Sequence, residues 1–179
     1  MSFKINSNPF YVVVQCTRHI LVSAIILLPM VSFAIDPNSK EPIEIESDRA
    51  TLDDKTGSST YTGNVIISQG ESQLEADYIV VNSKDRKISS IVATGTPAHF
   101  VQQNDAKDAT THGYGNSISY STELESLTFK GNARLIQDEN SFSGEEIEYD
   151  VTKKAIKAKG DESVGSRVKI QYFPNTTKK

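Results

Sequence analysis

Two histidines in the second half of the chain are the residues best suited to acid–base or metal chemistry. His99 lies between Ala98 and Phe100, and this alternation predicts a place on the polar face of a strand. His112 lies in residues 110–113, which we expect to form a loop. Neither has a second histidine, cysteine or carboxylate at metal-ligand spacing. We therefore expect no catalytic role for either histidine and no bound metal.

Adjacent carboxylates occur at Asp53-Asp54, Glu145-Glu146 and Asp161-Glu162. Glycoside hydrolysis needs two carboxylates that face each other across a cleft, and a calcium site needs a loop of spaced oxygen ligands. Neighbouring acidic residues in turns supply neither arrangement. The chain also lacks the G-x-S-x-G, P-loop and H-E-x-x-H patterns. The sequence therefore predicts a binding or structural protein that is not an enzyme and uses no cofactor.

The first 34 residues have the composition of a secretory signal peptide. They contain no Asp or Glu, and Lys4 and Arg18 precede an apolar run at residues 20–28. Ser32 and Ala34 place small residues at the positions that signal peptidase requires, so we expect cleavage after Ala34. The run is shorter than the roughly 20 residues of a membrane-spanning helix. An uncleaved membrane anchor remains the alternative.

Composition narrows the class of the exported part. The full chain has 179 residues, a net charge of −4, no Trp and one cysteine. That cysteine, Cys16, lies in the predicted leader, which excludes a disulfide framework and a cysteine nucleophile from the exported part. Lysines gather near the C-terminus, for example Lys153, Lys157 and Lys159. These lysines are interpreted either as solvated residues on a strand face or as the basic half of a head-to-tail contact between ends of opposite charge. Nucleic-acid binding is not expected of an exported protein.

Short alternating segments predict an all-β protein. Apolar and polar residues alternate at 43–46, 65–68, 118–120, 127–129 and 147–149, and Gly, Asn, Asp or Ser bounds each segment. Such a pattern is typical of half-buried antiparallel strands. Residues 62–69 and 130–137 also resemble each other, with Gly63-Asn64 matching Gly131-Asn132. Two-strand units of this kind must stack to bury their apolar faces, which predicts an elongated jelly roll or open sandwich with unpaired edges. Ordinary hairpins are the simpler interpretation of the repetition.

Several motifs in order resemble the OstA-like family of periplasmic lipopolysaccharide-transport proteins. They lie at residues 42–48, 61–65, 69–70, 76–77, 95–100 and 129–133, so the resemblance covers most of the predicted exported chain. It implies a twisted, V-shaped open β-jelly roll of about sixteen antiparallel strands. We expect this domain to span residues 35–165, followed by a C-terminal strand and basic tail at 166–179. The tail is shorter and less rich in Gln and Lys than the family pattern, which leaves the register of strand 168–173 open.

The resemblance also implies a function. Proteins of this family carry lipopolysaccharide across the periplasm, from the inner-membrane transport complex to the outer-membrane assembly complex. Copies join head to tail, with the N-terminal edge strand towards the inner membrane and the C-terminal edge strand towards the outer. The acyl chains of lipid A lie in the apolar interior. The alternatives are a membrane-anchored relative in the same pathway and a carbohydrate-active enzyme or lectin on a β-sandwich.

The resemblance assigns lipid contact to apolar residues of the predicted interior. Ile43, Ile45, Phe100 and Tyr120 match lipid-contacting positions of the family by motif. Further candidates are the apolar residues of the other predicted strands: Val65, Ile67, Leu74, Phe129, Leu135, Phe142 and Tyr149. Every one of these residues would also serve as ordinary core. Ile43 and Ile45 are the preferred candidates because they lie on the first strand, near an opening.

Overall fold

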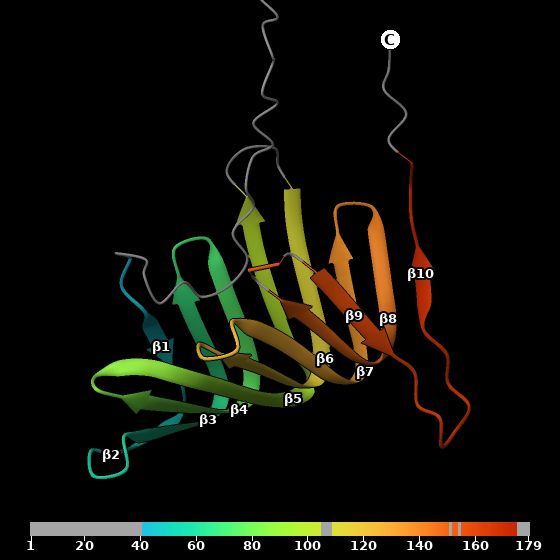
Figure 1. Ribbon diagram of the computed structural model, residues 1–179. Coiled ribbons are helices and arrows are strands. Elements are labelled where there is room, and N and C mark those ends of the chain that lie inside the picture. Colours follow the sequence, from blue (N-terminus) through green and yellow to red (C-terminus); the bar gives the residue numbers. More distant parts are fainter. Residues whose placement is uncertain (1–40, 105–108, 151, 154, 175–179) are drawn as a thin grey trace, which may run out of the picture. The chain divides into compact units, whose positions relative to one another are not determined.

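A computed structural model describes residues 41–104, 109–150, 152–153 and 155–174 (Figure 1). The predicted signal peptide at residues 1–34 lies outside these described residues. Within them, the chain has no helix that is both long enough and apolar enough to cross a membrane.

The described residues form one antiparallel sheet of ten strands. The strands are β1 (Glu44–Glu46), β2 (Arg49–Asp53), β3 (Ser58–Gln69), β4 (Ser72–Lys84), β5 (Lys87–Asn104), β6 (Ala109–Ser121), β7 (Ser126–Gln137), β8 (Asn140–Asp150), β9 (Ala155–Lys159) and β10 (Lys169–Gln171). Neighbours in sequence pair in space from β3 to β8, and short strands cover both ends: β1 and β2 pair with β3, and β9 and β10 pair with β8. The all-β prediction is confirmed.

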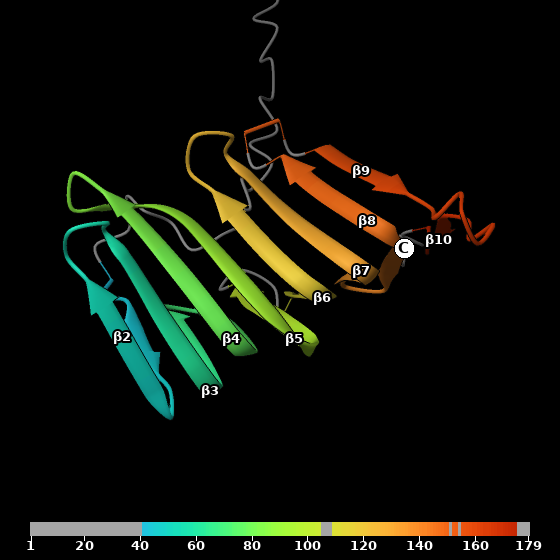
Figure 2. The ribbon, with the colours of Figure 1, turned by 90° about the horizontal axis from the view of Figure 1, so that it is seen from below.

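The long strands bend in the middle, and the sheet folds over on itself (Figures 1 and 2). The pairing of β3 with β4 shifts between Thr62 and Val65, and every later pair up to β7 with β8 has a shift at the corresponding place. On one side of the bend β3 pairs with β2 and β8 with β9; on the other side β3 pairs with β1 and β8 with β10. Each layer therefore contains one half of each long strand.

The number of strands differs from the expectation of about sixteen, because the halves of β3 to β8 remain continuous through their bulges and count as single strands. The C-terminal strand is also shorter than expected. Its regular part, β10, spans only three residues of the predicted 168–173.

The repeated Gly-Asn pairs produce two of the bends. Gly63 and Asn64 have φ values of +83° and +45°, and Gly131 and Asn132 have +76° and +52°. Glycine and asparagine adopt this left-handed conformation at the lowest cost, which explains why this pair recurs where a strand passes between layers. Asp48 caps the first bend: its backbone N–H donates to the Gly63 carbonyl oxygen at 2.9 Å, and its carboxylate accepts from the Asn64 amide at 3.2 Å.

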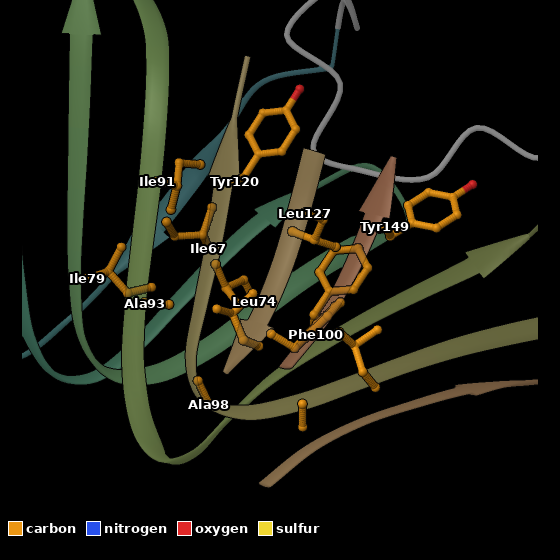
Figure 3. Close-up of a cluster of buried hydrophobic side chains, with 14 of the residues drawn as sticks. Ile67, Leu74, Ile79, Ile91, Ala93, Ala98, Phe100, Tyr120, Leu127 and Tyr149 are labelled. Carbon is orange, nitrogen blue, oxygen red and sulfur yellow. The ribbon is translucent and has the colours of Figure 1, made fainter. Parts of the chain in front are cut away.

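The hydrophobic core lies between the two layers, and both contribute to it (Figure 3). Val65, Ile67 and Leu74 come from one layer, and Ile79 and Ile91 from the other. Inward residues alternate with exposed or half-exposed ones over much of the long strands β3 to β8, as the period-two pattern predicts, whereas every residue of β2 and β10 is exposed. The buried set is Val65, Ile67, Leu74, Ile79, Val81, Ile91, Ala93, Ala98, Phe100, Ile118, Tyr120, Leu127, Phe129, Ala133, Leu135, Ile147 and Tyr149.

Candidate functional site

The predicted lipid-contacting residues form one continuous apolar surface inside the fold. Eight are buried in the core: Val65, Ile67, Leu74, Phe100, Tyr120, Phe129, Leu135 and Tyr149. The other three, Ile43, Ile45 and Phe142, are partly buried and pack against that core. The structure thus brings all of them to the inner face of the folded sheet, which is where the sequence placed them.

The interior is tightly packed around one small cavity. This cavity measures about 10 Å³ and is lined by Leu74, Ile91, Phe100, Ile118, Tyr120 and Leu127. A space of this size holds about one water molecule, and its lining is apolar. Side chains therefore fill most of the space between the layers around this cavity.

The two ends of the apolar surface lie beside the two edges of the sheet. At one end Ile45 of β1 is the cross-strand partner of Ile67, and at the other Ile170 of β10 is the partner of Phe142. Among the described residues, β1, β2, β9 and β10 have no strand on their outer sides. Large apolar side chains are exposed at both edges, including Leu52 of β2 and Ile170 of β10. The uncovered strands and the ends of the apolar surface therefore lie side by side.

Tyr149 contributes a phenol whose pKa is clearly displaced. Its side chain is 4% exposed. Burial, and then the nearby Asp150 carboxylate, raise the pKa of the Tyr149 phenol to about 12. An unshifted phenol is also neutral at pH 7, so the shift leaves the charge of the interior surface at neutral pH unchanged.

The acidic pairs stabilise turns and strand surfaces. The Asp53 carboxylate accepts hydrogen bonds from the backbone N–H groups of Lys55 and Thr56 at 2.9 and 3.3 Å, and these bonds lower the pKa of Asp53. Hydrogen bonds from the Ser163 hydroxyl and backbone N–H likewise lower the pKa of Asp161. A glycosidase acid needs a raised pKa, so these carboxylates have the opposite property.

Lysines near the C-terminus pair with carboxylates of β8. Lys157 lies 3.0 Å from Glu148, and Lys159 lies 3.7 Å from Glu146, which Lys130 also approaches at 3.5 Å. This geometry agrees with the interpretation of strand-face residues on β9. Exposed pairs of this kind contribute little to stability.

The prediction that His112 lies in a loop was wrong. His112 belongs to β6, and its Nδ1 lies 3.1 Å from Nε2 of His99 on β5. The planes of the two rings lie within 7° of each other. At this distance one nitrogen carries the hydrogen and donates it to the other, and the tautomers decide which one. Glu75 lies 3.7 Å from the other nitrogen of His99, and Tyr114 stacks on the His99 ring. The pair was missed because only the register of β5 against β6 brings these residues together.

Burial, and then the neighbouring His99, lower the pKa of His112. His99 lies on the polar face of its strand, as predicted. Within the described ranges, no three side chains of His, Cys, Asp or Glu converge to form a metal site.

Comparison with known families decides the identity of this fold. The family model described as LptA/(LptD N-terminal domain) LPS transport protein matches residues 44–155, which is more than half of the chain. The chain belongs to this LptA/LptD N-terminal-domain family. Its members are lipopolysaccharide-transport proteins, which gives the chain a role in lipopolysaccharide transport at the level of the family.

Individual members of the LptA family match over most of their length. The lipopolysaccharide export system protein LptA of Haemophilus influenzae is 33% identical over 87% of this chain and 91% of its own length. LptA of Escherichia coli K12 is 30% identical over 87% of this chain and 84% of its own. LptH of Pseudomonas aeruginosa is 28% identical over 83% of this chain and 87% of its own.

The fold comparison agrees with the family match. The crystal structure of LptH, the LptA-homologous periplasmic component of the lipopolysaccharide transport device of Pseudomonas aeruginosa, superposes with a TM-score of 0.69 at 26% identity. It covers 78% of this chain and all of the LptH chain. The predicted OstA-like jelly roll is therefore confirmed.

Proposed function

We propose that this chain is a non-enzymatic periplasmic protein that carries lipopolysaccharide from the inner-membrane transporter to the outer-membrane assembly complex. The observation that carries the proposal is the continuous apolar inner surface between Ile45 and Phe142, bounded by an uncovered strand at each end, in a member of the LptA family. The acyl chains of lipid A would lie against that surface.

Lipid entry in this proposal requires the two layers to separate. The cavity lined by Leu74 and Phe100 offers about 10 Å³, far less than an acyl chain needs. Opening exposes apolar side chains to water, which costs free energy. Each CH₂ of an acyl chain that becomes buried against them contributes roughly 0.8 kcal/mol of favourable transfer free energy. The core residues then have two partners in turn: each other when the protein is empty, and lipid when it is loaded.

The saccharide and phosphate groups of the lipid would remain in water at the mouth of the sandwich. Affinity then comes from the acyl chains, and an acidic protein of net charge −4 can carry a polyanionic lipid.

The uncovered edges would join the bridge together. An exposed edge accepts a partner's strand through main-chain hydrogen bonds. In this proposal β1 and β2 face the inner-membrane complex, while β9 and β10 face the next copy or the outer-membrane complex. A head-to-tail contact of this kind does not close on itself, so it extends the bridge copy by copy.

The domain boundaries follow from the same proposal. Residues 1–34 are removed after export, residues 35–165 form the lipid-binding jelly roll, and residues 166–179 carry the last strand and the basic tail. The competing possibility is a membrane-anchored relative that keeps its leader. The intact mass of the protein isolated from cells distinguishes the two, because only the anchored form retains residues 1–34.

Native mass spectrometry of the purified protein, with and without lipopolysaccharide over a series of protein concentrations, tests the proposal. We expect lipid-bound species together with a ladder of oligomers. A strict monomer that ignores lipopolysaccharide at every concentration would contradict both the lipid site and the head-to-tail assembly.

A further inference from the structure

A second concave surface lies on the outside of the folded sheet, on the side away from the core. This outer groove has a volume of about 450 Å³ and is lined by Thr96, Pro97, Tyr114, Asn116, Asn132 and Arg134. Tyr114 lies between buried Gly113 and Gly115, and Arg134 lies between buried Ala133 and Leu135. Alternation along the strands therefore points both side chains outward.

The bends of three strands build the outer groove. Its residues lie at or beside the register shifts of β5, β6 and β7. Asn132 projects from a left-handed backbone position, with φ +52°, and the Asn116 side chain lies against Gly131, where an added Cβ would come within 2.7 Å of it. The Thr96 hydroxyl donates to the Asp77 carboxylate at 3.3 Å, which fixes its position.

The polar groups of the outer groove are available to a ligand. Arg134 is exposed and, in the part of the chain that the structure describes, has no carboxylate partner. One ring face of Tyr114 stacks on His99, with centroids 4.5 Å apart and planes within 3°, so the ring is held in place. Tyr114 also lines the groove, where it offers an aromatic surface.

This combination has a specific chemistry. A guanidinium group binds a carboxylate or phosphate through two parallel hydrogen bonds. Side-chain amides supply both donors and acceptors, as the hydroxyl groups of a sugar require. An aromatic ring packs against the apolar face of a sugar ring. The volume falls within the usual range of pockets for small ligands, roughly 300–1,000 Å³.

We infer that the outer groove binds an anionic saccharide, a sugar ring that carries a carboxylate or phosphate. Arg134 binds the anionic group, the amides of Asn116 and Asn132 bind hydroxyl groups, and Tyr114 packs against the ring. The site lies outside the apolar interior, so it can be tested without any acylated lipid, and its failure leaves the lipid-transport proposal untouched.

Titration of the ¹⁵N-labelled protein with glucuronate, glucose 6-phosphate, glucose and inorganic phosphate, followed by ¹H–¹⁵N correlation spectra, tests the inference. We expect glucuronate or glucose 6-phosphate to shift the resonances of Tyr114, Asn116, Asn132 and Arg134 saturably. Glucose should bind at least about tenfold more weakly, as expected when a hydrogen bond to a charged group is lost. Inorganic phosphate should also bind more weakly than the phosphorylated sugar.

Two arginine variants distinguish binding at the outer groove from a non-specific attraction between the anion and positive charge on the protein. Arg134→Gln should abolish the preference for glucuronate over glucose. Arg49→Gln should leave it unchanged, because Arg49 is an equally exposed arginine on β2 outside the groove. Unchanged spectra with every sugar would overturn the inference. It would also be overturned if inorganic phosphate bound as well as glucose 6-phosphate, or if Arg134→Gln had no effect.

A final titration identifies the source of the saccharide. Oligosaccharide released from lipopolysaccharide by mild acid can be compared with glucuronate at the same resonances. Tighter binding of the oligosaccharide would assign the outer groove to the sugar portion of lipopolysaccharide, and tighter binding of glucuronate would assign it to a free sugar acid. Either result supports an anionic-saccharide site.

Discussion

Phe129 of β7 occupies the space in front of Gly113 on the neighbouring strand β6. A side chain on Gly113 would overlap the Phe129 ring, which is fully buried. The absence of a side chain on Gly113 thus allows the Phe129 ring to lie against the backbone of the neighbouring strand. How closely the Phe129 ring approaches β6 therefore depends on Gly113 having no side chain.

Gly113→Ala should therefore destabilise the protein. Overpacking of this kind costs about 1–3 kcal/mol of unfolding free energy, measured by urea denaturation. Phe129→Leu in the same chain should recover part of the loss, because it removes the ring atoms that the new methyl group meets. If the loss of unfolding free energy in the double variant equals the sum of the losses in the two single variants, the two residues are not coupled.

Ile45→Asp tests the interior lipid surface. Ile45 is only partly buried, so we expect the variant to remain folded by circular dichroism. Lipopolysaccharide binding should weaken at least about tenfold, because an acyl chain would have to cover a carboxylate. Leu124→Asp is the matched control, since Leu124 is 72% exposed in the turn between β6 and β7. Normal binding by folded Ile45→Asp would mean that the lipid surface is misplaced.

Charge at the C-terminal edge tests head-to-tail assembly. Ile170 and Tyr172 are 60% and 68% exposed at or beside β10. The double variant Ile170→Glu/Tyr172→Glu should raise the concentration for half-association at least about tenfold, because a partner strand would desolvate both charges. Sedimentation velocity measures the effect, with Leu124→Glu as the control. Oligomers that persist unchanged would exclude this edge as the contact.

The two left-handed glycines Gly63 and Gly165 separate backbone strain from side-chain overlap. Their φ values are +83° and +70°, so alanine at either should cost about 1–2 kcal/mol. A Cβ on Gly63 would also overlap the Asp48 carboxylate, whereas one on Gly165 would meet nothing within 4 Å. Thermal unfolding should therefore show the larger loss for Gly63→Ala. Equal losses would mean that Asp48 moves aside freely.

Lowering the pH should destabilise the folded protein because His112 becomes protonated more readily when the chain unfolds. Its pKa is lowered in the folded protein, so the unfolded chain binds the proton more readily. The free energy of unfolding should fall as the pH drops through about 6.5, until folded His112 also becomes protonated. His112→Gln should flatten this part of the pH profile, measured by urea denaturation between pH 7.5 and 5. Parallel profiles for the two proteins would contradict the assignment.

The sequence by itself determined which residues face the core. Alternation at residues such as Val65, Ile67 and Leu127 fixed the strand faces, because a strand has a period of two whatever it pairs with. The repeated Gly-Asn pairs, of which Gly131-Asn132 is one, stood out in the sequence only as a repeat. The structure shows that the strands bend at them, and few other residues adopt the left-handed backbone required there at low cost.

Only the tertiary structure decided which residues meet across strands. The hydrogen bond between His99 and His112, and the outer groove around Arg134, depend on the register of β5, β6 and β7. Register is set by the packing of both layers together, and no single segment encodes it. The close packing of the core has the same origin, because the space between two layers depends on the summed volumes of side chains from strands far apart in the chain.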